Sequence, residues 1–385
     1  MKRFALMSLV ALFVISILAP PDVVAQLFRR VPVQRAGAIA RARIQATSTK
    51  IHIDSKIHML FVWGTKATDT RVATEISKKK IEDLISMMQG SLEELAEGLG
   101  NRNHNYVGTV LTLEGNDASP QNILDACRKL AQNARPNDAV LVYILCHGAS
   151  VVEDDDTTGT RVHALSPLAE NAENLNLRTI GIRRSSILRE MKSSQHRLDM
   201  LVTDACSVLR SEPKLGRERM QDRMDSASWD EFRIDVPVLV PLLLAAEGTI
   251  NINSSHPDKG SMNQGELALA WVPTRTVESY EEGRNWVFDD SDKFSGTVFT
   301  NAFVEVGGRM VRLNLRRSSP ETTSRELLKH ASPEAFFSQL SSSLSKHYTA
   351  TKKHVQDSRG SGIEVFMQQQ TQTLTLFDDR GVALP

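Results

Sequence analysis

The sequence predicts an α/β fold in which a mainly parallel sheet carries helices on both faces. Two observations lead to this prediction. Apolar runs of strand length alternate along the chain with segments whose apolar residues recur at helical spacing. The first of these runs, within 56–65, ends at Gly64 and is typical of a buried strand. A repeated strand–helix rhythm of this kind favours parallel strands joined by helical crossovers.

Local signals place the elements in order. After the first strand, apolar residues recur at helical spacing from Ile81 to Leu99, and Gly98 and Gly100 mark the end of that helix. A helix over 119–134 has a serine cap followed by a proline at its first position. The remaining strands are predicted at 105–115, 138–148, 198–206 and 249–253, and the remaining helices at 185–194 and 237–248.

The composition limits the class of protein. The chain has 385 residues, of which 41% are hydrophobic, and this is enough for one sizeable core. Lysine plus arginine number 46, and aspartate plus glutamate also number 46. A net charge of zero argues against a nucleic-acid-binding protein, which usually presents a basic face. Nucleic acid is therefore not an expected partner.

The N-terminus has the features of a secretory signal peptide. Lys2 and Arg3 precede an apolar run, 4–18, that is short for a membrane span. Cleavage is expected after Ala25, which makes 1–25 a signal peptide and the mature chain an exported protein, periplasmic or extracellular, without a stable membrane span. An uncleaved membrane anchor is the alternative. The segment 26–50 holds basic residues and no acid, and it is predicted to be a flexible linker or a pro-segment.

The tripeptide Asp-Ala-Cys occurs twice, and the two copies differ in context. In the first copy, Cys127 shares a helix face with Ile123 and Leu130, which predicts a buried and inert thiol. In the second copy, Cys206 stands where its strand ends. The working residues of such sheets gather at that carboxyl edge. The third cysteine, Cys146, is expected in the core.

His147 supplies a base for a reactive Cys206. It ends the apolar strand 138–148 and is followed by Gly148. If the two strands are neighbours in the sheet, imidazole and thiol meet, and His147 can generate the nucleophilic thiolate. The backbone N–H groups of Gly148 and Cys206 can then form an oxyanion hole.

The ordered set His147-Gly148, then Asp204-Ala205-Cys206, resembles the caspase/metacaspase-like cysteine peptidases. The histidine lies 59 residues before the cysteine (206 − 147), close to the spacing of about 50 in that pattern. The resemblance implies a caspase-like α/β/α sandwich. It also implies a His/Cys dyad that cleaves peptide bonds in protein or peptide substrates.

The resemblance also implies a specificity. Arginine-directed relatives carry an aspartate two residues before the cysteine, so Asp204 is implied to pair with an arginine or lysine of the substrate. The segment 252–266 resembles the pocket strand of the family, which implies substrate-binding roles for Ser254 and Ser255. The residues after Cys206, Ser-Val-Leu, match neither the His-Ser-Gly of metacaspases nor the Arg-Gly of caspases. The alternative function is a catalytically inactive caspase-fold module that binds peptides or partner proteins.

Two charged segments flank the expected site. The acidic run Glu153 to Asp156 favours a solvated loop, with calcium binding as the alternative. No zinc motif, phosphate-binding loop or dinucleotide fingerprint is present, so no metal or other cofactor is expected apart from that calcium. The segment 210–233 is rich in charge, and the resemblance implies an exposed loop of the kind that is cut during activation.

The peptidase domain is predicted to span 51–308. The remainder, 309–385, is predicted to be an extension that completes the domain or packs on it. It contains a helix that begins at Ser332-Pro333 and an alternating segment, 363–377, that can add an edge strand to the main sheet. The sequence predicts no oligomeric state.

Overall fold

The computed structural model describes the chain from residue 45 onward, with gaps. All described residues belong to one of the two compact units of the chain, Ile44–Pro385. The predicted signal peptide, 1–25, and most of the basic segment 26–50 lie outside them. The described residues are 45–68, 70–101, 103–152, 161–171, 177, 180–205, 233–255, 296–314, 319–359, 374–380 and 382–383.

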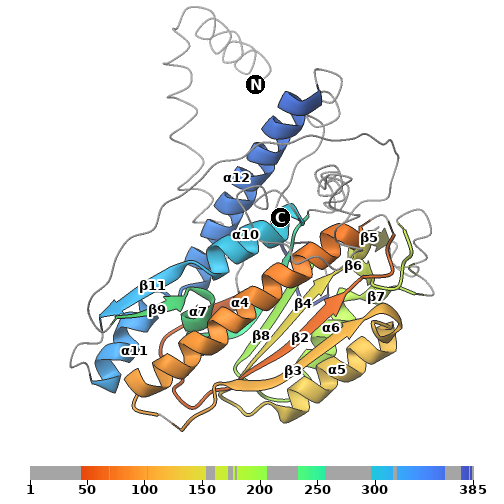
Figure 1. The fold of residues 1–385 in the computed structure, drawn as a ribbon. Helices are drawn as coiled ribbons and strands as arrows, with labels where there is room; N and C mark the ends of the chain where they lie inside the picture. Colours follow the sequence, from red (N-terminus) through yellow and green to blue (C-terminus); the bar gives the residue numbers. More distant parts are fainter. Residues whose placement is uncertain are drawn as a thin grey trace, which may run out of the picture. The chain divides into compact units, whose positions relative to one another are not determined.

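A sheet of seven strands forms the centre of this unit (Figure 1). Its strands are β1 (Gln45–Ser48), β2 (Ile57–Trp63), β3 (Val107–Glu114), β4 (Ala139–Leu145), β8 (Leu198–Asp204), β10 (Ala246–Asn253) and β12 (Thr375–Leu376). The main path runs β1-β10-β8-β4-β2-β3, and β12 also pairs with β10. The four contacts from β10 to β3 are parallel, whereas β1 and β12 are antiparallel to β10. The predicted mainly parallel sheet is therefore confirmed.

The interior strands of this sheet are buried over their whole length. β2, β4 and β8 are buried at every position, as expected for parallel strands with helices on both faces. β3 forms one edge of the sheet, and exposed and half-buried residues alternate along its C-terminal half, from Val110 to Glu114. The continuous apolar runs in the sequence therefore correspond to the strands at the centre of the sheet.

Helices cover both faces and complete an α/β/α sandwich (Figure 1). One face carries α4 (Arg71–Gly98), α10 (Val298–Gly307) and α12 (Pro333–Arg359), and the other carries α5 (Pro120–Asn133) and α6 (Arg184–Met191). Aromatic rings join α10 to its neighbours, because the Phe303 ring lies 5.6 Å from the Tyr143 ring of β4 and 6.1 Å from the Phe336 ring of α12. The arrangement is compatible with the caspase-like sandwich that the resemblance implies.

The first turn of α5 forms as its sequence predicts. The hydroxyl of Ser119 accepts the backbone N–H of Asn122 at 3.2 Å, and Pro120 occupies the first helical position. Cys127 lies on the buried face of this helix and is itself fully buried, so the prediction of a core thiol is confirmed. Burial raises the pKa of this thiol far above its ordinary value, which keeps it protonated and unreactive.

Ordered structure begins earlier than the sequence indicated. β1 lies inside the segment 26–50 that was expected to be a linker, and it pairs with β10 from Gln45 to Ser48. A four-residue edge strand has no hydrophobic alternation by which it could be recognised. The expected edge strand in 363–377 is observed as β12, which pairs with the other end of β10 at Ile252 and Asn253. Two short strands from distant parts of the chain therefore cover one edge of β10.

Two smaller sheets flank the main one. β5 (His147–Val152), β6 (Arg161–Ser166) and β7 (Ile182–Arg183) form an antiparallel sheet, and β9 (Arg233–Pro237) pairs with β11 (Met310–Asn314). The helix predicted at 237–248 is the short α7 (Leu239–Ala245), which leads directly into β10, and α11 (Pro320–Leu328) follows β11. The 3-10 turn η1 (Gly115–Asp117) precedes α5.

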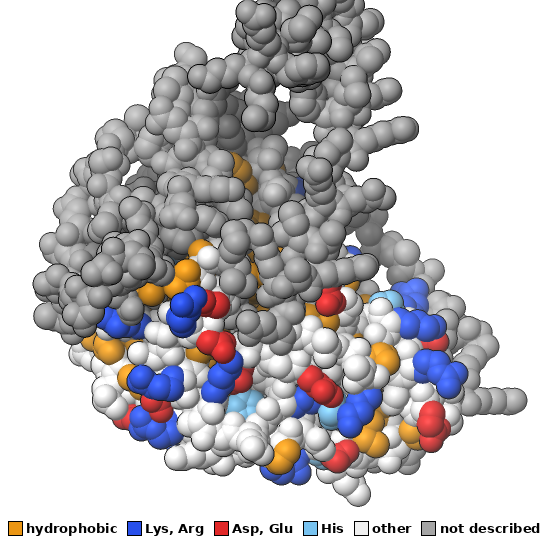
Figure 2. Space-filling model, turned by 180° about the vertical axis from the view of Figure 1, so that it is seen from behind, with side chains coloured by type: hydrophobic (Ala, Val, Ile, Leu, Met, Phe, Trp, Pro, Cys, Tyr) orange, Lys and Arg blue, Asp and Glu red, His pale blue; other side chains and the backbone are white. Residues whose placement is uncertain are grey.

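Charges of both signs are mixed on the surface. Figure 2 shows basic and acidic side chains interspersed over one face of the described residues, with no large area of one sign. This fits the balanced composition of the chain. None of the helices described in the structure is both long enough and apolar enough to cross a membrane.

Candidate active site

The ends of β4 and β8 lie side by side at the carboxyl edge of the sheet. In their parallel register Leu145 is the Cα partner of Asp204. The backbone N–H of Cys146 donates to the carbonyl of Asp204 at 3.2 Å, which continues the contact past the last strand residue. His147 and Cys206 stand two residues beyond this register pair in the sequence. The two segments that carry them therefore leave the sheet at neighbouring points.

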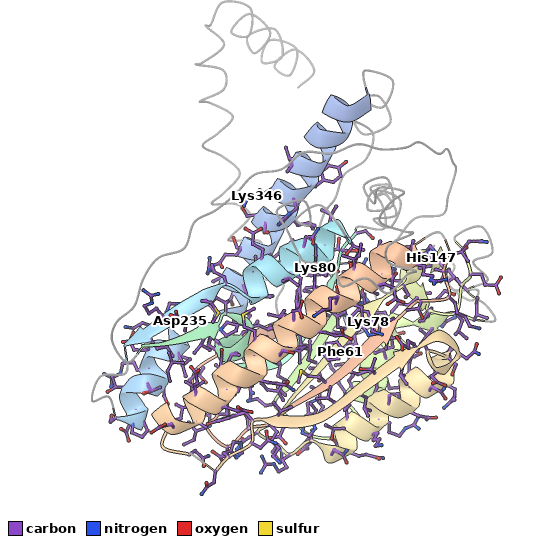
Figure 3. The ribbon with its side chains drawn as sticks, viewed as in Figure 1. Phe61, Lys78, Lys80, His147, Asp235 and Lys346 are labelled. Carbon is purple, nitrogen blue, oxygen red and sulfur yellow. The ribbon has the colours of Figure 1, made fainter. Side chains whose placement is uncertain are left out.

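His147 is the first residue of β5, not the last residue of β4. β4 ends at Leu145, and Cys146 forms a bend before the next strand begins. The expectation of one strand over 138–148 is thus wrong at its end, because the chain turns out of the sheet at the bend. His147 is only 3% exposed. Figure 3 places it at the end of the sheet far from Asp235 of β9.

The backbone around His147 is tied into the small antiparallel sheet. His147 is the register partner of Ser166, and Gly148 is the partner of Leu165. Gly148, expected to lend a backbone N–H to an oxyanion hole, is therefore part of a strand. The backbone of His147 and Gly148 is therefore held by the antiparallel pairing of β5 with β6.

Gly64 makes room for the bend between β4 and β5. Its N–H donates to the carbonyl of Leu145 at 2.8 Å, and a Cβ built on Gly64 would lie 2.9 Å from the Cβ of Cys146. Only glycine avoids this clash. Cys146 is buried, its Sγ donates to the carbonyl of His147 at 3.1 Å, and burial raises its thiol pKa far above the ordinary value. The prediction of a core thiol at Cys146 is confirmed.

Cys206 lies outside the described residues. The structure describes the chain up to Ala205 and again from residue 233. It therefore places Ala205, the residue before the predicted nucleophile, directly after the last residue of β8. The other two cysteines, Cys127 and Cys146, are free and buried.

Asp204 is a buried carboxylate at the end of β8. It is 4% exposed and accepts hydrogen bonds from the hydroxyls of Thr297 and Thr300, the second at 3.0 Å. Within the described part of the chain, no cation forms a salt bridge with it. Burial raises the pKa of Asp204 to about 6, and hydrogen bonds to the carboxylate oppose that rise.

The N-terminus of α10 holds this carboxylate in place. Thr297 is the cap of the helix, and its hydroxyl accepts the N–H of Thr300 at 3.1 Å while it donates to Asp204. The hydroxyl groups of Tyr143 and Thr300 are hydrogen-bonded at 2.8 Å, which anchors the same turn to β4. The positive end of the helix dipole favours the ionised form of a carboxylate at this position.

Ser254 and Ser255 lie against the backbone of β8. Both residues are fully buried. The hydroxyl of Ser254 accepts the N–H of Ala205 at 3.1 Å, and the hydroxyl of Ser255 donates to the carbonyl of Ala205 at 2.9 Å. The structure thus brings these two predicted site residues next to Asp204 and Ala205. Their hydroxyls form hydrogen bonds with the backbone of Ala205.

The charged segments that flank the site in the sequence are not among the described residues. The acidic run 153–156, for which calcium binding is the alternative prediction, lies in one gap of the described chain. The segment 210–232 lies in another. Among the residues that are described, no group of three or more His, Cys, Asp or Glu side chains could hold a metal ion.

Sequence reasoning missed several residues that support the site. Thr297 and Thr300 hold Asp204. The sequence does carry a signal for Thr297, because a threonine directly before an apolar helical segment is a typical N-terminal cap. Asn253, Thr203 and Arg184 form a buried polar chain beside Ala205. No local pattern reveals this chain, because its members come from three separate elements.

The fold and the site together define an α/β protein with buried polar groups gathered at the carboxyl edge of a mainly parallel sheet. A comparison with protein-family models gave no match, and a comparison with curated proteins gave none either.

Proposed function

We propose that this protein is an exported cysteine endopeptidase of the caspase/metacaspase-like type that cleaves after arginine or lysine. The observation that carries the proposal is the register of β4 and β8. It aligns Leu145 with Asp204, so that the segments with His147 and Cys206 leave the same edge of the sheet together. The burial of Cys127 and Cys146 supports the choice of Cys206 as the reactive thiol.

In the proposed reaction, His147 accepts the proton of the Cys206 thiol. The sulfur then bonds to the substrate carbonyl carbon, and the π electron pair moves onto the oxygen. When this tetrahedral intermediate collapses, the carbonyl re-forms, the C–N bond breaks, and the leaving amine takes the proton from His147. The product of this half-reaction is a thioester on Cys206.

Water completes the cycle. His147 removes a proton from a water molecule as its oxygen bonds to the thioester carbonyl carbon. The second tetrahedral intermediate expels the Cys206 thiolate, which regains the proton from His147, and the carboxylic acid product leaves. No cofactor is needed for these steps, since the groups of the dyad supply and recover every proton.

Asp204 supports the proposed preference for basic residues. It is a buried carboxylate that no described cation neutralises. A cationic side chain from the substrate would offset the cost of burying this charge and would bond to it strongly. Thr297 and Thr300 hold the carboxylate in one position, which favours a geometric selection of arginine or lysine.

The purified protein and its Cys206→Ala variant test the proposal on a peptide library. The wild type should cut peptides after arginine or lysine, and Cys206→Ala should cut none. Cys127→Ala is a matched control, because it removes a buried thiol that lies on a helix away from the site. Equal cleavage by the wild type and Cys206→Ala would refute the proposal.

A further inference from the structure

The C-terminal segment 374–380 adds a strand to the edge of β10. Its residues in β12 pair with the last two residues of β10. Directly after β12, the N–H of Phe377 donates to the carbonyl of Asn251 at 2.9 Å, and the side-chain amide of Asn251 donates to the carbonyl of Asp378 at 3.0 Å. Proteins bind extended peptides in this way when a peptide adds a strand to a sheet edge. The segment is therefore held as a docked peptide is held.

The ring of Phe377 packs on two residues of other elements, His163 of β6 and Arg184 of α6. Phe377 is 5% exposed, and its ring centre lies 5.4 Å from the centre of the imidazole ring and 4.6 Å from the guanidinium carbon. The two rings are stacked, at an interplanar angle of 27°. A guanidinium above an aromatic face is attracted by the electrons of the ring. His163 and Arg184 thus form a support for an aromatic side chain, which we call the ring platform.

Arg184 is held so that the flat face of its guanidinium meets this ring. It is fully buried, and burial lowers the pKa of its guanidinium to about 9, so it stays charged at neutral pH. Its described hydrogen-bond partners are neutral: the side chains of Asn251, Thr203 and His163, and the carbonyl of Ile252. Burying a charge without an acidic partner is unfavourable, which favours a role in recognition over a role in stability alone. Because the N–H groups of a guanidinium lie in its plane, these bonds leave its face for an aromatic ring.

A lysine binds the acidic end of the segment. The Nζ of Lys192, the residue after α6, lies 2.8 Å from both carboxylate oxygens of Asp379. The neighbouring Asp378 is used inside the segment, where its carboxylate accepts the N–H groups of Arg380 and Val382 at 3.0 and 2.9 Å. The segment thus offers an aromatic ring and, two residues later, a carboxylate to two cations of the domain.

The segment also brings apolar side chains into the core. Leu374 and Leu376 are 7% and 6% exposed and belong to the large core cluster that includes residues of α4, α10 and α12. Successive residues of a strand point to opposite faces, so Leu376 joins this core while Phe377 reaches the ring platform. The segment therefore carries the pattern Leu-x-Leu-Phe-x-Asp, in which each named residue has a contact of its own.

We propose that this edge of β10, together with the ring platform and Lys192, is a docking site for an extended peptide of the pattern Leu-x-Leu-Phe-x-Asp. Segment 374–380 occupies the site as a ligand on the same chain. The partner that fits is a protein with an extended segment in which an aromatic residue stands two positions before an acid, and its docking displaces segment 374–380. Complementary charge supports this class of partner, because the site supplies two cations and the ligand supplies a ring and a carboxylate. The site contains no residue of the proposed dyad, so the inference is independent of the peptidase proposal.

The test measures how tightly a separate peptide binds to the full-length chain. The probe is a fluorescent peptide that copies residues 374–379 and contains no arginine or lysine, so the proposed peptidase specificity does not cut it. In the wild type, the attached segment competes with the probe at an effective concentration on the order of 1 mM. Phe377→Ala removes the ring from this competitor and leaves the site itself unchanged. The probe should therefore bind Phe377→Ala about 100-fold more tightly than the wild type, as expected for the loss of one buried phenylalanine.

A second variant weakens the attached segment without touching the buried ring. Asp379→Lys changes an exposed residue and places a lysine opposite Lys192, so this chain should fold as the wild type does. The probe should bind it about fivefold more tightly than the wild type, which is the upper size of effect for an exposed ion pair. Circular dichroism checks the fold of both variants.

Two matched controls locate the probe in the site. A probe with alanine in place of its phenylalanine should bind Phe377→Ala about 100-fold more weakly than the original probe. In a Lys192→Glu/Phe377→Ala chain, the original probe should bind about fivefold more weakly than in Phe377→Ala. A probe with lysine in place of its second aspartate should recover that loss, because opposite charges then meet again.

Binding of the probe to the folded variants no tighter than to the wild type would overturn the docking site. Equal binding of the probes with and without the aromatic ring would overturn it too. Either result would leave the peptidase proposal intact, since peptide cleavage is not what this experiment measures.

Discussion

Leu145 at the end of β4 and Asp204 at the end of β8 are register partners in adjacent parallel strands. Both strands are buried along their length, and the parallel ladder between them fixes their register. The chain bends directly after Leu145, where Gly64 allows close approach, and the histidine segment is then supported on β6. These contacts give the proposed dyad a rigid base in the sheet.

The first prediction concerns the dyad. Cys206→Ala and His147→Ala should each abolish peptide cleavage, because one lacks the nucleophile and the other lacks the group that generates the thiolate. Cys127→Ala should keep its activity and lose on the order of 1 kcal/mol of stability, as is typical of a single substitution. Steady-state kinetics and urea unfolding measure the two effects. Full turnover by His147→Ala would exclude its role as the base.

The second prediction concerns specificity and pH. Asp204 must be ionised to bind a cationic side chain, and its pKa is raised to about 6. The ratio of kcat/KM for arginyl over citrullinyl peptides should therefore increase as the pH rises through about 6. Citrulline has the shape of arginine without its charge, so effects of His147 on both substrates cancel in the ratio. A ratio that does not change with pH would show that Asp204 does not bind the charged side chain of the substrate.

Asp204→Asn should remove this preference for charge. We expect a loss of about 2–5 kcal/mol in transition-state binding for arginyl peptides, as for other broken buried charge pairs. Citrullinyl peptides should be affected much less. The comparison of kcat/KM for the two peptides in wild type and variant measures this loss. A wild-type enzyme that prefers aspartate before the scissile bond would contradict the assignment.

The third prediction concerns the cost of burying Asp204. Its pKa in the folded protein is raised above its ordinary value of 3.8 to about 6, so the folded state binds this proton more tightly than the unfolded state. The contribution of Asp204 to stability therefore falls as the pH rises between about 4 and 6. Relative to wild type, Asp204→Asn should gain free energy of unfolding over this range. Urea titrations at several pH values measure the difference, and a constant difference would show that Asp204 titrates normally.

The fourth prediction concerns the C-terminal part of the described chain. Phe377 is buried, its ring lies 5.4 Å from the ring of His163, and the guanidinium carbon of Arg184 lies 4.6 Å from its centre. Phe377→Ala should cost about 3 kcal/mol or more of stability through lost packing and the lost cation–π contact. Phe377→Leu should cost less. Thermal or urea unfolding measures both losses. A Phe377→Ala variant with the stability of the wild type would mean that this segment does not stabilise the domain.

A fifth prediction follows from the proposed specificity and from the arginines of the basic segment 26–50 and the charged segment 210–233. An enzyme that selects arginine should cut its own chain after Arg residues in one or both segments. Wild type and Cys206→Ala are incubated with and without calcium, and the fragments are sequenced. New ends after these arginines in the wild type alone would support self-processing. Identical fragments in both proteins would assign the cuts to another protease.

The central strands could be predicted because each is an apolar run long enough to be recognised locally. The break between β4 and β5 could not, since Cys146 continues the apolar pattern and no turn residue precedes His147. The bend depends on Gly64, which lies far away in the sequence and next to it in space. Likewise, β1 is recognisable only through its partner β10, because a strand of four residues carries little pattern of its own.

The carboxyl-edge position of Asp204 also followed from the sequence, but its surroundings did not. One of the two hydroxyls that donate to Asp204 belongs to Thr297, which is 93 residues away along the chain. Arg184 is a further example, because a charged residue in a short helix is expected at the surface. Its burial depends on acceptors that three other strands supply, and no local pattern carries that information.

The most direct test of the account is active-site labelling with an arginyl peptide chloromethyl ketone, followed by mass-spectrometric mapping of the adduct. This reagent needs both a reactive thiol and a pocket that accepts arginine. The account predicts one adduct per chain on Cys206, strongly reduced in Asp204→Asn and absent in Cys206→Ala. A wild-type protein that forms no adduct, or one that is labelled on Cys127 or Cys146 instead, would contradict it.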